Sequence, residues 1–335
     1  MEFVNGNFLI LHSNYIEIIK DIQKIPRSLP KVTSIDMNLL GFNFPNNGKL
    51  TNPIEDIKNI KLYPTTELLI PREIYAYDES IKKYSCLEGD GYLTAHSLIH
   101  LGDYDYDPKG LLSFYFYTHS KLITEKSKLI RYSEDPEIDS KKDYIQDRIL
   151  FLAEQTPRNS ILLIDGPLIG GDVYTYMIRS IDAFLEKDII PVFFVKNSNS
   201  NMVCESIDSF SEKYNSDMHW SYDFLSKGER TNFFVYTDKY NKQNAKIFCY
   251  IKAYNKSPQR IEFHIKTYDK HKDEIEKILN LVYYYLLAQG EKNPQVRPIA
   301  VAEKYAREFI KLSDLDKVFF NYGLVPTMNQ ERFGR

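Results

Sequence analysis

The acidic residue with the most distinctive surroundings is Asp165. It follows the apolar run Ile161-Leu162-Leu163-Ile164 and precedes Gly166-Pro167. Such a run is typical of a strand buried on both faces, and Gly-Pro cannot continue a strand, so Asp165 is predicted to end it. Because ligands of open α/β sheets bind beyond the carboxyl ends of strands, Asp165 is a candidate for a catalytic or metal-binding group. The alternative is a turn or helix-cap aspartate, which is common in proteins.

Two further carboxylates suit the same chemistry. Asp36 ends the short β-like run 31–36, and Asp147 lies on a segment with helical periodicity. Two divalent cations held about 3.5–4 Å apart by such oxygen ligands hydrolyse phosphodiesters, since one activates water and the other stabilises the leaving oxygen. The chain has 46 acidic residues, so spacing alone does not single out these three.

The elements that must position these residues follow from hydrophobic periodicity. A helix is expected over 141–155, before Asp165. The strand 161–165, a helix over 173–186 and a strand over 189–196 then form a strand–helix–strand unit, whose strands are expected to be parallel. The remaining expected elements are a helix over 14–24, strands over 31–36, 39–44, 68–71, 74–77, 233–236, 247–252 and 261–266, the last two antiparallel neighbours, and helices over 271–289 and 298–312. The pattern indicates a mixed α/β fold.

Composition limits the classes of protein. The chain has 335 residues, 43% of them hydrophobic and 27% charged, and no repeat or long linker divides it, which favours a single domain over 1–335. No apolar stretch is long enough for a membrane helix, and no signal peptide is evident, so we expect no membrane association and a cytoplasmic location. The formal net charge of −3 argues against a protein that coats DNA by charge alone.

Several motifs resemble the NurA family of DNA-end-processing nucleases. Ile164-Asp165-Gly166-Pro167-Leu168 is similar to the family's IDGxL motif. Further along, the segment 191–198, with Lys196 near Ser198, resembles the next strand of the family, and 223–231 resembles its D…L…GER[ST] segment. These landmarks occur in the family's order. The resemblance implies a ribonuclease-H-like mixed sheet flanked by helices, with N- and C-terminal helical elaborations.

The resemblance also implies an active site. Its metal ligands would be Asp36, Asp147 and Asp165, with Lys196 and Glu303 as further catalytic residues. The chain departs from the family at three of these positions. Asp36 lacks the usual Asp-Gly-Ser sequence. The helix position, usually Glu, falls on Asp147, with Glu154 as the alternative. In the C-terminal motif, Gln295 and Glu303 stand where the family has Tyr and His.

The function implied is that of a divalent-metal-dependent deoxyribonuclease with a two-metal Mn²⁺ or Mg²⁺ site, acting as exonuclease or endonuclease on DNA ends. Family members are homodimers that work with a HerA-type hexameric ATPase, so DNA and such an ATPase are the expected partners, in DNA end processing or anti-phage defence. A catalytically silent scaffold subunit for that ATPase is the alternative, given the altered motifs. A small-molecule α/β enzyme is disfavoured, because the sequence has no glycine-rich phosphate loop.

Overall fold

The computed structural model describes residues 2–3, 10–11, 48–50, 57–102, 105–126, 130–169, 176–196, 198–238, 245–313 and 317. The predicted helix over 14–24 and the predicted strands over 31–36 and 39–44 lie outside these residues. None of the helices in the described part is long and apolar enough to cross a membrane.

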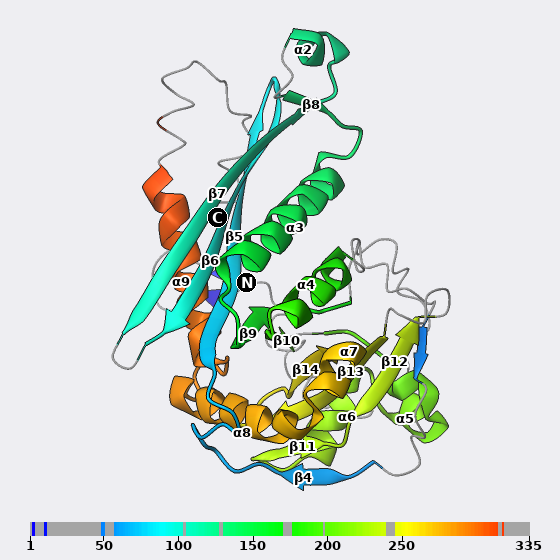
Figure 1. The fold of residues 1–335 in the computed structure, drawn as a ribbon. Helices are drawn as coiled ribbons and strands as arrows, with labels where there is room; N and C mark the ends of the chain where they lie inside the picture. The colour runs from blue at the N-terminus through cyan, green and yellow to red at the C-terminus, as the bar shows by residue number, and fades with distance from the viewer. Residues whose placement is uncertain are drawn as a thin grey trace.

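One mixed sheet organises the described chain (Figure 1). It has 12 strands in the described residues, ordered β3-β12-β13-β14-β10-β9-β5-β6-β7-β8, with β11 joining β13 to β4. The strand bounds are β3 Gly48–Leu50, β4 Asn59–Lys61, β5 Glu73–Cys86, β6 Gly89–Leu101, β7 Tyr106–Thr118, β8 Ile130–Tyr132, β9 Ser160–Asp165, β10 Ile190–Val195, β11 Glu229–Thr231, β12 Phe234–Asp238, β13 Ala245–Lys252 and β14 Gln259–His264. A separate pair joins β1 (Glu2–Phe3) to β2 (Ile10–Leu11).

The centre of the sheet has a recognisable topology. The five strands β7-β6-β5-β9-β10 stand in the order 3-2-1-4-5 of their appearance in the chain. Strand β6 is antiparallel to both β5 and β7, whereas β5, β9 and β10 are parallel. This is the ribonuclease-H-like arrangement, so the fold class expected from the sequence is confirmed. The expected parallel pairing of 161–165 with 189–196 is confirmed too, as is the antiparallel pair β13–β14.

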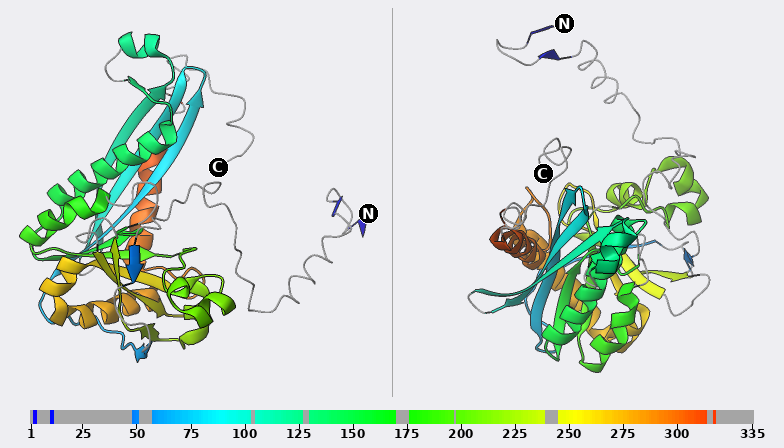
Figure 2. Two further views of the ribbon diagram at one scale, coloured as in Figure 1. Left: turned by 90° about the vertical axis from the view of Figure 1, so that its right-hand side faces the viewer. Right: turned by 90° about the horizontal axis from the view of Figure 1, so that it is seen from above.

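Helices cover both faces of this sheet (Figures 1 and 2). Their bounds are α2 Lys121–Lys126, α3 Pro136–Gln155, α4 Ile181–Glu186, α5 Asp208–Lys213, α6 Asp217–Phe224, α7 Ile265–Lys270, α8 Lys272–Gln289 and α9 Arg297–Ser313, with 3-10 turns η2 Tyr176–Ser180 and η3 Cys204–Ser206. On one face, α3 and α4 bury Ile145 and Phe184 against Ile164. On the other face, α8 and α9 bury Ile278 and Ile299 with Leu163. The apolar run of β9 is therefore explained, because both of its faces are covered.

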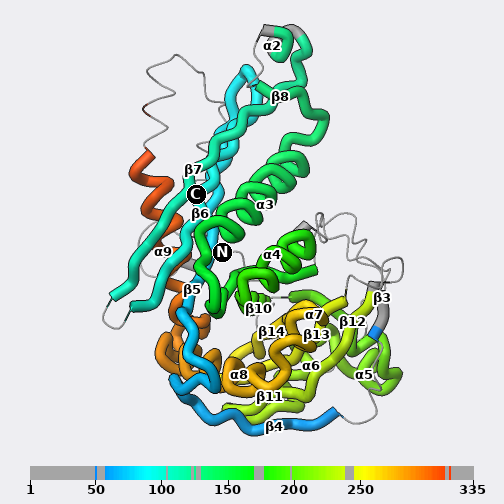
Figure 3. The backbone as a smooth tube through the Cα atoms, viewed as in Figure 1, coloured from blue at the N-terminus to red at the C-terminus, as the bar shows by residue number. Residues whose placement is uncertain are grey.

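The first three central strands are much longer than the last two. Strands β5, β6 and β7 have 14, 13 and 13 residues and extend as an arm beyond β9 and β10, a path that can be followed in Figure 3. Segment 74–77 is part of β5 as expected, but 68–71 is not a strand. The predicted helix over 173–186 is a 3-10 turn followed by the short α4 in the described residues.

Candidate active site

Two carboxylates lie side by side where β9 ends. In the parallel pair β5–β9, Tyr77 is opposite Ile164, so Asp78 and Asp165 are the next residues on neighbouring strands. Gly166 then turns the chain away with a φ of 98°, a conformation that favours glycine, and its N–H donates to Phe194 O at 2.8 Å. The strand therefore ends at Asp165, as predicted, because the chain turns at Gly166. Asp78 lies beside Asp165 on the neighbouring strand β5.

A lysine and a glutamate approach Asp165 from other elements. Lys196 directly follows β10, and its Nζ lies 2.9 Å from Asp165 Oδ2 and 3.8 Å from Glu303 Oε2 on α9. Gln295 Nε2 donates to Glu303 at 3.3 Å, and Arg307 forms a salt bridge with the same carboxylate. The structure therefore brings together three of the residues selected from the sequence: Asp165, Lys196 and Glu303.

Asp78 is buried, the Asp165 side chain is 22% exposed, and the pair carries an excess of negative charge. Asp78 is 6% exposed. Burial, together with the charges of Asp165 and Glu79, raises the pKa of Asp78 to about 8, although Lys196 acts in the opposite direction. Burial also raises the pKa of Asp165, against the effect of Lys196 and with additions from Glu79 and Glu303. Because ionised carboxylates repel one another in a poorly solvated place, this position favours a bound cation.

The raised pKa of Asp78 predicts a pH dependence of stability in metal-free protein. An unfolded chain loses this proton near pH 3.9, whereas the folded protein retains it to about pH 8. The stabilising contribution is complete below the lower value and is lost as the pH rises through the upper one. We therefore expect the melting temperature in EDTA to fall more steeply from pH 5 to pH 8 for the unmodified protein than for Asp78→Asn. Equal slopes for the two proteins would contradict this assignment.

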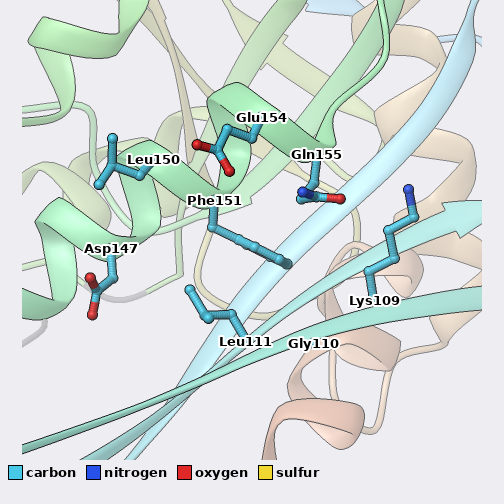
Figure 4. Close-up of a pocket in the computed structure, with 8 residues that line it drawn as sticks. All are labelled: Lys109, Gly110, Leu111, Asp147, Leu150, Phe151, Glu154 and Gln155. Carbon is cyan, nitrogen blue, oxygen red and sulfur yellow. The ribbon is translucent and has the colours of Figure 1, made fainter.

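The other two predicted metal ligands are not seen at this cluster. Asp36 lies outside the described residues. Asp147, on α3, accepts a hydrogen bond from Tyr115 Oη at 2.6 Å. In the described part of the chain no contact joins Asp147 or Glu154 to Asp165. Both line a groove of about 610 Å³ between α3 and β7 instead (Figure 4).

Three residues near the cluster escaped the sequence analysis. Asp78-Glu79-Ser80 has the Asp and the Ser of the family's Asp-Gly-Ser sequence, which Asp36 lacks, and it follows the strand-like residues 74–77; this signal could have identified Asp78. On α3, Asp147 meets Tyr115 on β7, whereas Arg148 meets β5, where it forms a salt bridge with Glu79. Helical periodicity defines an apolar stripe, but it does not fix the rotation of a helix to within one residue.

A buried ionic network holds the loops on both sides of the cluster. Glu262, which is fully buried, accepts from Lys246 Nζ and Arg260 Nε at 2.7 Å each and from Leu168 N at 2.9 Å. Lys246 also donates to Ile169 O at 3.2 Å, beyond Asp165 in the chain. Arg260 Nη1 donates to Ser198 Oγ at 3.3 Å, beyond Lys196. The network therefore fixes the segments that follow both site residues.

The donor set fits a hard divalent cation. Carboxylate oxygens such as those of Asp78 and Asp165 are the ligands that Mg²⁺ and Mn²⁺ prefer, and burial, with the charges of Asp165 and Glu79, raises the pKa of Asp78. As the side chains are placed, no group of three His, Cys, Asp or Glu in the described residues is spaced to hold a metal ion. Lys196 Nζ instead provides the positive charge beside Asp165.

The topology and the cluster together define a class: a ribonuclease-H-like α/β protein with an acidic site at the carboxyl ends of its central strands. A family model, the NurA domain, matches residues 54–308. The chain belongs to the NurA family. Asp78, Asp165, Lys196 and Glu303 lie within the matched residues, and Asp36 lies before them.

Similar solved structures include NurA proteins. The NurA nuclease from Sulfolobus solfataricus has 10% identity and a TM-score of 0.46, over 91% of this chain and 93% of that chain. A structure of NurA with manganese has 9% identity and a TM-score of 0.44, over 91% and 96%. Endonuclease V from Streptomyces avermitilis has 9% identity and a TM-score of 0.37, over 76% and 87%. A comparison with curated proteins gave no match.

Proposed function

We propose that this protein is a divalent-metal-dependent deoxyribonuclease that hydrolyses phosphodiester bonds at DNA ends. The observation that carries the proposal is the juxtaposition of Asp78, within β5, and Asp165, at the carboxyl end of β9, with Lys196 on Asp165, inside the residues that match the NurA domain. One structure similar to this chain is that of a NurA bound to dAMP and manganese, which supports a nucleotide substrate and a metal.

The residues would divide the chemistry as follows. Asp78 and Asp165 would hold the cations of a two-metal site, which when bound supplies an activated water and stabilises the leaving oxygen. The ammonium group of Lys196 would donate to a non-bridging phosphate oxygen when a cation takes its place at Asp165. Glu303, itself held by Gln295 and Arg307, keeps Lys196 at the site. Asp36 and Asp147 stay predictions as further ligands.

The assembly is also proposed from family membership. We propose a homodimer that acts with a HerA-type hexameric ATPase in DNA end processing or anti-phage defence. With a formal net charge of −3, the chain offers little general attraction for DNA, which agrees with delivery of DNA by another subunit. Location in the cytoplasm stays a prediction.

The test is an assay of purified protein on linear DNA labelled at either end, in Mn²⁺, Mg²⁺ or EDTA, with and without the ATPase. We expect cleavage in Mn²⁺ or Mg²⁺ and none in EDTA. If the ATPase is bound and DNA stays intact in both metals, the protein is the silent scaffold and the nuclease proposal fails. One observation favours the scaffold alternative: the ammonium group of Lys196 pairs with Asp165, at the position where a metal would bind.

A further inference from the structure

A buried ion pair stands beside the acidic cluster on the α3 side of the sheet. Glu79 Oε1 on β5 pairs with Arg148 Nη2 on α3, and the two side chains are 15% and 8% exposed. The Arg148 guanidinium also lies over the Tyr77 ring, 5.4 Å from its centroid. Helix α9, which carries Glu303, covers the opposite face (Figure 2). The pair is therefore separate from the salt bridges of Lys196.

Because β9 ends at Asp165, it does not extend alongside Glu79, and Glu79 can approach the acidic cluster from the α3 side. The pair Tyr77–Ile164 is the last between β5 and β9, and beyond it β5 has β6 alone as a hydrogen-bonded neighbour in the described chain. Glu79 N–H donates to Asp78 Oδ1 at 2.8 Å. Burial raises the pKa of both Asp78 and Asp165, and the charge of Glu79 adds to this effect.

The ion pair is incomplete as it stands. Among the described residues, neither Glu79 Oε2 nor Arg148 Nε has a hydrogen-bond partner, although both atoms are buried. An unsatisfied buried polar atom costs about 1–3 kcal/mol, and more when the group is charged. In native proteins such atoms commonly mark the place of a bound ion or water. Many metal-binding carboxylates use one oxygen to bind the metal, while a neighbouring side chain holds the other oxygen and orients the group. Glu79 has this arrangement, because Arg148 holds Oε1 and Oε2 has no hydrogen-bond partner among the described residues.

We propose that Glu79 is the third carboxylate of the metal site and that Arg148 positions it, in the role that the sequence assigned to Asp147. The inference rests on the proposed metal-dependent function. Strand β5 would then supply two neighbouring acids, Asp78 and Glu79, while α3 supplies a cation instead of an acid. In the metal-bound protein, Glu79 would keep one oxygen on Arg148 and turn the other, which has no hydrogen-bond partner in the described part of the chain, toward Asp78 and Asp165.

The test is Mn²⁺ binding to the full-length protein, measured by titration of the free-ion EPR signal, with urea unfolding in EDTA alongside. Glu79→Gln is expected to weaken Mn²⁺ binding by at least about tenfold. Arg148→Gln breaks the same ion pair but retains the carboxylate as a ligand, so we expect a clearly smaller loss of Mn²⁺ affinity than for Glu79→Gln. A purely structural pair would lower both affinities equally, and that outcome would overturn the proposal.

Two further variants separate the alternatives. Asp147→Asn is expected to keep the Mn²⁺ affinity within about twofold, because its carboxylate is engaged by Tyr115. If Asp147→Asn weakens binding and Glu79→Gln does not, Asp147 is the ligand. Should Glu79→Gln fail to fold, Glu79→Asp keeps the charge but shortens the reach, and unchanged Mn²⁺ affinity in that variant would also overturn the proposal.

The same titration distinguishes this inference from the proposed function. If the unmodified protein binds Mn²⁺ and cleaves DNA while Glu79→Gln binds Mn²⁺ equally well, the role of Glu79 is refuted and the nuclease assignment stands. If the unmodified protein neither binds Mn²⁺ nor cleaves DNA, both are refuted.

Discussion

Asp165→Asn is expected to abolish DNA cleavage while the protein remains folded. The substitution preserves the size of the side chain but removes the charge that a metal ligand requires, at the end of β9 beside Asp78. Metal ions contribute several kcal/mol of transition-state stabilisation, so the loss should reduce the rate by about a thousandfold or more. The measurement is the single-turnover rate on end-labelled linear DNA in Mn²⁺.

The matched control for this variant is Asp182→Asn. Asp182 lies on α4, its side chain is 71% exposed, and it pairs with Lys266 at the surface. The control should cleave DNA at the rate of the unmodified protein. A rate for Asp165→Asn above about a tenth of the unmodified rate, with circular dichroism showing a folded chain, would remove Asp165 from the site.

Glu262→Gln should produce the largest loss of stability. Glu262 is fully buried and is the common acceptor of Lys246 and Arg260, whose side chains are 3% and 4% exposed. Burial already lowers the pKa of Lys246 to about 8, and Glu262 opposes this shift. Removing the shared anion leaves buried positive charges without compensation, which costs about 3–5 kcal/mol. Urea unfolding in EDTA measures the change in the free energy of unfolding.

A surface ion pair provides the comparison for Glu262→Gln. Lys266→Gln breaks the exposed pair with Asp182 and should cost less than about 1 kcal/mol. Because Glu262 holds Leu168 and its partner Arg260 holds Ser198, we also expect Glu262→Gln to lower the cleavage rate. A loss of stability no greater than that of the surface variant would mean that the network does not anchor the site loops.

The parts of the fold that were predictable have strong local patterns. The apolar runs of β9 and β10 mark strands buried on both faces, and the helix between them requires a parallel pairing. The same reasoning placed Asp165 and Lys196 at neighbouring strand ends, where the structure joins them at 2.9 Å. The proximity of Glu303 followed only from the family resemblance, because nothing in the periodicity of α9 indicates which strand it faces.

Other features depend on long-range packing and were missed. The first strand of the site was expected at 31–36, whereas the first central strand of the described chain is β5, whose length and mixed composition resemble an exposed arm more than a core strand. Asp78 was overlooked for that reason, although Ser80 follows it in the expected pattern. On α3, neighbouring residues point about 100° apart, so a small rotation of the helix decides which of them meets β5, as Arg148 does, and which meets β7, as Asp147 does.

Diffraction from crystals grown with Mn²⁺, recorded at the manganese absorption edge, tests the central claim most directly. We expect an anomalous difference peak bound by the carboxylates of Asp78 and Asp165, with Lys196 displaced from Asp165. A fully occupied Mn²⁺ elsewhere, or no peak in crystals of protein that cleaves DNA in the same buffer, would contradict the assignment of this cluster as the catalytic metal site.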